Sequence, residues 1–330
     1  MYILYLLIAL IIVVFLFLTT KVNQLQHGKQ KAYEELRQLH FGKISSFGSV
    51  KKLSILPLID FYTDKKELKT EPGVSYLIRA DNTTILLDVG YNVGKTHPSP
   101  LLENMQALGI STKDIDAIFI SHLHLDHLGG MNEQRKKIFS VSQGPVELNK
   151  IPVYAPDYLS PSEWNSEPYV DVIRDPKVLK PGIVSIGVHP RYLFIMGYTL
   201  EHSLAVNVEG KGIVLIIGCG HQTIERIIER AQEIFDEPIY AIVGGLHFPI
   251  NGGRIMKGPV NIQYIVGSDN TPWNGLKEQD VANAIDLVGR VNPQLVSLSP
   301  HDSSDWSIEQ FKKAFGNKYV ELKVGKEILL

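Results

Sequence analysis

The sequence predicts an α/β protein built as a four-layer αββα sandwich, preceded by one apolar helix at the N-terminus. Three observations carry this prediction. The chain opens with an unbroken apolar run, its first strand patterns follow one another closely, and its later strand patterns alternate with helical ones. Local strand pairing followed by strand–helix alternation suggests two sheets packed face to face with helices outside. No Pro/Gly/Ser-rich linker interrupts residues 47–330, so we expect a single domain there.

The apolar run covers residues 2–18 and reads YILYLLIALIIVVFLFL. Seventeen residues form about 25 Å of helix, near the short limit for a bilayer core of about 30 Å. No basic residue precedes the run and no small-residue cleavage pattern follows it, which favours an uncleaved transmembrane anchor over residues 1–20. A cleaved signal peptide is the alternative. Residues 21–46 are expected to form a polar stalk.

Basic residues follow the apolar run but do not precede it, which favours a cytoplasmic catalytic domain. A periplasmic or extracellular domain stays open as the alternative, since almost no chain lies on the other side. The basic residues are Lys21, Lys29, Lys31 and Arg37.

Composition excludes several classes of function. The 33 Lys and Arg residues are balanced by 35 Asp and Glu residues, so no basic excess directs the chain to nucleic acid. A hydrophobic fraction of 44% excludes intrinsic disorder as the main state. The one cysteine, Cys219, excludes an intramolecular disulfide and a cysteine-based zinc finger.

Short apolar runs predict the strands, and apolar residues at helical spacing predict the helices. The segments 157–182 and 249–276 lack clear periodicity and are expected to be loops or insertions at the rim of a site. The predicted strands are 54–59, 74–80, 83–90, 117–122, 151–156, 204–209, 212–218, 240–245 and 294–299, and the predicted helices are 99–109, 222–235, 278–291 and 307–315.

A dense group of histidines directly follows the predicted strand at 117–122. Residues i and i+2 of an extended chain point to the same side, so His122 and His124 converge. The chain then turns, and Asp126 and His127 enter the same space from the start of a helix. Three imidazoles and one carboxylate within six residues suit divalent metals such as zinc.

This H-x-H-x-D-H string resembles the signature of the metallo-β-lactamase superfamily, and the likeness extends over roughly residues 50–330. The resemblance implies the four-layer metallo-β-lactamase sandwich as the fold. Asp88, at the end of TILLD, matches an early aspartate of the family, which supports a metal ligand by orienting it.

Two downstream strings resemble the dihydropterin-synthase-like branch of that superfamily. The first, Gly218-Cys219-Gly220-His221, lies between a strand and a helix. The second, Gly244-Gly245-Leu246-His247, follows the next strand, with Leu246 in an aromatic position of the branch. The branch's C-terminal Cys-His-Cys-Thr-Gly is replaced by Ser299-Pro300-His301-Asp302-Ser303, which keeps the histidine and lacks both cysteines.

The resemblance implies two metal ions, zinc first and iron or manganese as alternatives. It implies that His122, His124 and His221 hold one ion, with His202 in reserve if His221 points away. Asp126, His127 and either His247 or His301 would hold the other, the remaining histidine lining the pocket. Cys219 is either a soft ligand in the bridging position or a small buried hydrophobe.

Three functions follow as hypotheses. The first is a metal-dependent hydrolase that attacks an ester, lactone or phosphoester-type small molecule with a metal-activated water, with Asp126, His247 and His301 as its catalytic residues. The second is an iron-dependent thiol or persulfide oxygenase on the same fold. The third is a non-catalytic binding protein. Neither the substrate nor the oligomeric state follows from the sequence.

Overall fold

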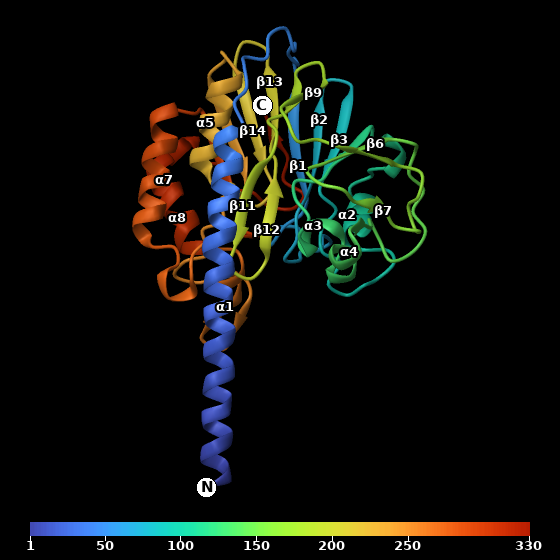
Figure 1. The fold of residues 1–330 in the computed structure, drawn as a ribbon. Helices are drawn as coiled ribbons and strands as arrows, with labels where there is room; N and C mark the ends of the chain where they lie inside the picture. Colours follow the sequence, from blue (N-terminus) through green and yellow to red (C-terminus); the bar gives the residue numbers. More distant parts are fainter.

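The computed structural model describes all 330 residues and confirms the sandwich: two main sheets lie face to face with helices on both outer sides (Figure 1). The first has the order β19-β1-β2-β3-β4-β6-β8 and the second the order β18-β15-β14-β13-β10-β9. The first sheet contains β1 (Leu53–Ile59), β2 (Ser75–Ala80), β3 (Thr83–Leu87), β4 (Ala117–Phe119), β6 (Pro152–Ala155), β8 (Tyr169–Val172) and β19 (Ile328–Leu329). The second contains β9 (Lys177–Lys180), β10 (Ile183–Ser185), β13 (Leu204–Val208), β14 (Gly212–Ile217), β15 (Ile239–Gly244) and β18 (Leu295–Leu298).

Strand β14 shows how the sequence builds these layers. Val214 and Ile216 join the buried cluster between the two sheets, while Ile213, Leu215 and Ile217 join the cluster beneath the outer helices. Alternate residues of a strand point to opposite faces, so a continuous apolar run is what a strand buried on both faces requires.

Helices cover the outer face of each sheet. Helix α2 (Pro100–Ala107) packs on the first sheet, and its N-terminus is capped by the Ser99 side chain, which accepts a hydrogen bond from Leu102 N. Helices α5 (Ile224–Ile234), α7 (Glu278–Val291) and α8 (Asp305–Phe315) cover the second sheet. The short helices are α3 (Leu125–Leu128), α4 (Met131–Lys136), α6 (Ile262–Val266), η1 (Thr112–Asp114), η2 (Pro272–Asn274) and η3 (Gly316–Lys318).

Two segments that were expected to be loops contain strands. Segment 157–182 carries β8 and β9, which extend the two sheets at their edges, together with β7 (Ser160–Pro161). Segment 249–276 contains a small hairpin of β16 (Met256–Lys257) and β17 (Val260–Asn261) and the short helices α6 and η2. The strand β5 (Ile138–Phe139) pairs with β7. Edge strands with polar residues on one side lack a strong hydrophobic pattern, which is why the sequence does not show them.

Helix α1 (Tyr2–Gln38) runs without a break through the predicted anchor and on into the predicted stalk as far as Gln38. Its apolar half projects from the domain, and none of its apolar window is buried (Figure 1). It is one helix long and apolar enough to cross a membrane. Its second half lies along the hairpin of β11 (His189–Leu193) and β12 (Gly197–Glu201), with Leu25 and Ala32 buried.

Gly28 lies between these two buried residues on the same helix face, where a glycine is otherwise unfavourable. A Cβ atom at this position would overlap the ring of Tyr192 in β11. The helical part of the predicted stalk, up to Gln38, is thus docked on the domain, and Gly28 permits the close approach.

Candidate metal centre

The predicted site residues gather at one end of the sandwich, where the parallel strands finish. Strands β3 and β4 are parallel, as are β14, β15 and β18. Asp88 follows β3, His122 follows β4, Cys219 follows β14, His247 follows β15 and His301 follows β18. Carboxyl ends of parallel strands meet at one edge, so residues far apart in the sequence converge there.

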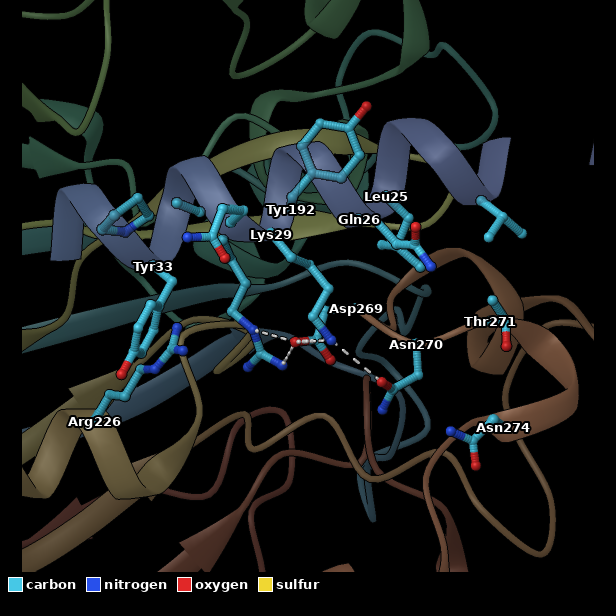
Figure 2. A pocket seen from close by; sticks show the side chains of 15 residues that line it. Leu25, Gln26, Lys29, Tyr33, Tyr192, Arg226, Asp269, Asn270, Thr271 and Asn274 are labelled. Carbon is cyan, nitrogen blue, oxygen red and sulfur yellow. Dashed lines mark hydrogen bonds and ion pairs between the residues drawn. The ribbon is translucent and has the colours of Figure 1, made fainter. Parts of the chain in front are cut away.

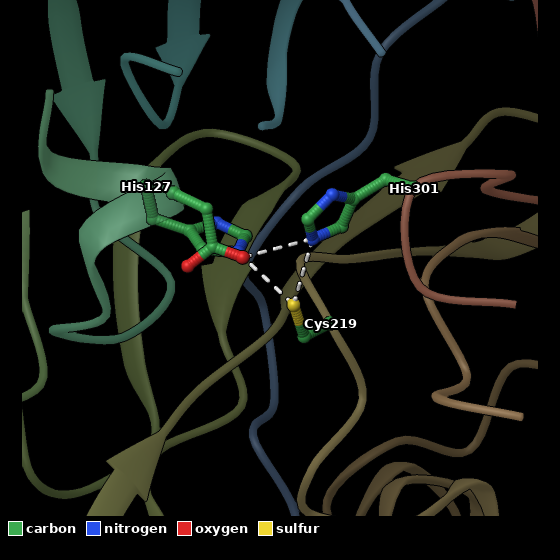
Figure 3. Close-up of side chains that lie close together, drawn as sticks. His127, Cys219 and His301 are labelled. Atoms are coloured by element: carbon green, nitrogen blue, oxygen red, sulfur yellow. Dashed lines mark hydrogen bonds and ion pairs between the residues drawn. The ribbon is translucent and has the colours of Figure 1, made fainter. Parts of the chain in front are cut away.

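Three groups of possible metal ligands converge around one sulfur atom. In each group the donor atoms lie within 4.8 Å of one another, and Cys219 belongs to all three. The groups are Asp126, His127, Cys219 and His301; His122, Cys219 and His221; and Cys219, His247 and Asp302. Figure 3 shows Cys219 between His127 and His301, and its Sγ atom lies 3.0 Å from His127 Nε2 and 3.4 Å from His301 Nε2.

The second group brings His122 and His221 together across the sheets. Their ring centroids are 5.1 Å apart, and both side chains are buried. The ring of His124 lies 4.4 Å from that of His122, but its Nε2 atom faces the Thr199 hydroxyl at 3.3 Å. His124 therefore borders this group without pointing Nε2 at Cys219.

His202, the reserve ligand of the sequence analysis, is not part of the cluster. Its Nδ1 atom lies 2.9 Å from the Ser185 hydroxyl and its Nε2 atom 2.9 Å from the Ile120 carbonyl oxygen. Its ring stacks on Phe119. With both nitrogens bonded, His202 is a core residue and has no donor atom left for a metal.

The carboxylate of Asp88 contacts both Ser121 and His127. Its carboxylate accepts hydrogen bonds from the Ser121 backbone N–H and hydroxyl, both at 2.7 Å. His127 Nδ1 lies 2.6 Å from the same carboxylate. The bonded Nδ1 fixes the ring so that Nε2 faces Cys219.

Glu201, at the end of β12, holds the Cys219 loop, and sequence reasoning missed it. Its buried carboxylate accepts hydrogen bonds from Cys219 N at 3.2 Å and from Gly220 N at 2.8 Å. Burial raises its pKa to about 7, although these backbone bonds oppose the shift. Only the fold, which brings the end of β12 against the loop that follows β14, reveals this role.

The position of His247 depends on neighbours that the sequence did not identify. Its backbone N–H donates to Asp302 at 3.0 Å, and its φ of +54° is rare for a residue with a side chain. A Cβ atom on Gly267 would overlap the His247 ring, so glycine is required where α6 ends. The ring lies 4.3 Å from that of His221.

Burial and neighbouring charges perturb most groups in the cluster. Burial lowers the pKa of His122 and His221 well below the usual value, and neighbouring imidazoles lower it further. Burial also lowers the pKa of His127, but the charges of Asp88 and Asp126 overcome it and raise the value to about 9. Burial raises the pKa of the Cys219 thiol well above its usual value. A bound cation would reverse that direction, because a coordinating thiol loses its proton.

Unpartnered nitrogen atoms test whether these residues fit a metal. Buried polar atoms are normally hydrogen-bonded. Here five buried imidazole nitrogens in the cluster have no partner: His122 Nε2, His221 Nδ1, both ring nitrogens of His247, and His301 Nδ1. Crowded neutral imidazoles together with a thiol and carboxylates are a donor set that zinc and related divalent ions accept. The residues present fit a metal centre.

Comparison with known proteins agrees with this architecture. The model of the metallo-beta-lactamase superfamily matches residues 68–255. A 7,8-dihydropterin-6-methyl-4-(beta-D-ribofuranosyl)-aminobenzene-5'-phosphate synthase from Methanocaldococcus jannaschii is 27% identical over 247 residues, which cover 62% of this chain and 80% of the relative.

Two solved structures share the fold. Tm1679, described as a metal-dependent hydrolase of the beta-lactamase superfamily, superposes with a TM-score of 0.56 at 17% identity and covers 84% of this chain and 98% of its own. The metallo-beta-lactamase fold protein YhfI from Bacillus subtilis superposes with a TM-score of 0.50 at 11% identity and covers 84% of this chain and 99% of its own. The matched family model, the αββα sheets and the converging ligand groups together show that this chain belongs to the metallo-β-lactamase superfamily.

Proposed function

We propose that this protein is a membrane-anchored, metal-dependent hydrolase that cleaves an ester, lactone or phosphoester-type small molecule. The observation that carries the proposal is the convergence of three ligand groups on Cys219. Membership of a superfamily that generally binds divalent metals supports it. Bound divalent ions of this kind lower the pKa of water and polarise the bond that is attacked.

The chain's own residues divide into two sets around Cys219. His122 and His221 form one ligand group with it, and we assign them, with His124 beside them, to one ion. Asp126, His127 and His301 form another group with it, and we assign them to the second ion. His247 and Asp302 form the third group, and His247 lines the cavity that opens beside His221.

Asp126 is the residue best placed to accept a hydrogen bond from water and to orient it. Its side chain is 22% exposed, whereas His127 is fully buried. Burial raises its pKa, but the charges of His127 and His301 overcome this and hold the pKa well below the usual range. Its Oδ2 atom lies 3.1 Å from His301 Nε2, and this bond raises the pKa of His301 and keeps the carboxylate ionised.

Helix α1 supplies the proposed membrane attachment, with the domain on the cytoplasmic side. Its apolar window lies outside the domain, where only a membrane or another protein could cover it. Protease added to intact membrane vesicles of known orientation tests on which side of the membrane the domain lies. We expect digestion in inside-out vesicles and protection in right-side-out ones, and the reverse pattern would overturn the assignment.

Full-length protein in detergent, assayed with a panel of phosphodiester, lactone and β-lactam substrates, tests the activity. We expect turnover of a phosphodiester or a lactone, and a loss of about 10²–10⁴ in kcat/KM for Asp126→Asn. Asp286→Asn, an exposed carboxylate on α7, is the matched control and should keep full activity. Equal turnover by Asp126→Asn and the control would reject a role for the cluster in hydrolysis.

A further inference from the structure

A cavity of about 470 Å³ lies between the docked half of α1 and the domain. Its walls come from α1, β11, α5 and the segment that follows α6, and none of the metal-centre residues lines it. Figure 2 shows Lys29 pointing from α1 towards Asp269 and Asn270, with Arg226 beside Tyr33. A volume of this size is typical of sites for small organic ligands.

Three cationic side chains and one carboxylate line this cavity. Asp269 pairs with Arg191, whose Nη2 lies 2.6 Å from Oδ2, and with Lys29, whose Nζ lies 3.5 Å from the same oxygen. The third cation, Arg226, has no carboxylate within 4.0 Å of its guanidinium and donates no side-chain hydrogen bond. The cavity walls thus carry an excess of two positive charges.

Arg226 is the least compensated of these groups. Burial lowers the pKa of its guanidinium, and the positive charge of Arg191 lowers it further. Asp269, Glu225 and Glu229 act in the opposite direction, but none forms an ion pair with it. A half-buried cation without a partner is costly, so an anion in the cavity would relieve it.

We propose that this cavity binds a phosphate-type dianion, as phosphate itself or as a phosphomonoester, on Arg226, Lys29 and Arg191. A phosphomonoester carries about two negative charges at neutral pH, which matches the excess on the walls. Arginine presents a planar fork that binds phosphate oxygens in pairs. The side-chain N–H groups of Asn270 and Asn274 remain available for the organic part of an ester.

The length of α1 sets the distance between this site and the membrane. Lys29 lies eleven residues beyond Leu18, where the apolar run ends, which is about 16 Å along the helix. The headgroup layer extends only about 5–8 Å beyond the hydrocarbon. The phosphate is therefore expected from a soluble compound, and a lipid phosphomonoester is the competing source of the same chemistry.

The cavity also adjoins the metal centre. It shares Arg191, Asp269 and Asn270 with a second cavity of about 390 Å³, which reaches His221 and His247. Arg191 Nη1 donates to the His221 carbonyl oxygen at 2.7 Å. A phosphate on Arg191 would therefore lie against the wall of the metal centre without occupying it.

The test is calorimetric titration of inorganic phosphate into the full-length, metal-loaded protein in detergent micelles. It measures binding alone, so its result does not depend on the proposed hydrolysis. We expect Arg226→Gln to raise the Kd at least tenfold and Lys29→Gln at least threefold. Arg79→Gln, a half-exposed cation of β2 that lines neither cavity, is the matched control and should stay within twofold of wild type.

Phosphate bound at the metal centre is the competing result. A site that is retained in Arg226→Gln and Lys29→Gln but lost in Asp126→Asn belongs to the metals and overturns the proposal. Lys29 lies outside the domain core, so Lys29→Gln keeps the test valid if Arg226→Gln fails to fold.

The source of the phosphate is resolved by repeating the titration in nanodiscs. Discs of phosphatidylcholine alone are compared with discs that contain phosphatidic acid. An unchanged Kd for inorganic phosphate in both supports the soluble source. If phosphatidic acid weakens phosphate binding severalfold and Arg226→Gln removes this difference between the two discs, the site belongs to the lipid and the soluble source is overturned.

Discussion

The Nδ1 atom of His127 lies 2.6 Å from the carboxylate of Asp88, and both side chains are fully buried. Asp88 sits at a φ of +55°, a conformation that residues with side chains rarely adopt, so the backbone after β3 is shaped to make this contact. The contact leaves His127 Nε2 facing Cys219, at the centre of the cluster.

Replacing Asp88 with asparagine should weaken metal binding at the ion that we assign to His127. The amide keeps the size of the side chain but removes the charge that orients the imidazole. We expect the metal affinity to fall about 10–100-fold, measured by competition with a chelator of known affinity. Asp286→Asn is the matched control, and an equal affinity in the two variants would show that Asp88 does not act through His127.

His301 and His247 should respond differently to substitution. The sequence leaves open which of them completes the second ion site. The structure groups His301 with Asp126 and His127, and His247 with Asp302. We therefore expect His301→Ala to lose one metal equivalent per chain and His247→Ala to keep both while losing activity. Metal loss in His247→Ala with full retention in His301→Ala would reverse the assignment.

Gly28→Ala should undock the second half of α1, because the added methyl group overlaps the Tyr192 ring. We expect faster proteolytic cleavage within residues 21–46 and a lower melting temperature. Gly289→Ala, inside α7, is the matched control, since no atom lies within 4 Å of its added methyl group. That variant should gain about 0.5–1 kcal/mol in free energy of unfolding. Identical proteolysis of Gly28→Ala and wild type would mean that the helix is not held by this contact.

The metal-free protein should lose stability in mild acid. Burial lowers the pKa of His202 and of His189 to about 3. Since these folded-state values lie below the unfolded value of about 6.5, the unfolded chain takes up protons first as the pH falls. The stabilisation is therefore complete above pH 6.5 and is lost towards pH 3.

Proton uptake by the unfolded chain should lower the free energy of unfolding by about 2 kcal/mol for each of these two histidines between pH 6.5 and pH 5. Urea unfolding of chelator-treated protein at pH 7 and pH 5 measures this loss. His202→Gln should show a smaller loss than wild type over the same interval. Equal wild-type stability at the two pH values would contradict the prediction.

Much of the fold could be predicted because the relevant signals are local. The face of α5 formed by Ile224, Ile227, Ile228, Ala231 and Ile234 is buried as its spacing indicates. The Ser99 cap of α2 and the boundaries of α7 also follow the sequence pattern. The histidine string lies after a strand, as its flanking apolar residues predict.

The remaining features depend on contacts between distant segments. Glu201 looks like an ordinary strand glutamate until β12 is placed beside the Cys219 loop. The requirement for Gly267 becomes visible only once the His247 ring is packed against it. The docking of α1 rests on Tyr192, more than 160 residues away, and no pattern in a single sequence reports such a pair.

The metal content of the purified full-length protein tests the central proposal most directly. Elemental analysis should find two divalent ions per chain, with zinc as the expected element, and fewer in variants that lack His122 or Asp126. Iron in place of zinc would favour the oxygenase alternative. Less than one ion per chain in wild-type protein, after purification without chelators and incubation with zinc, would contradict the assignment of this cluster as a metal centre.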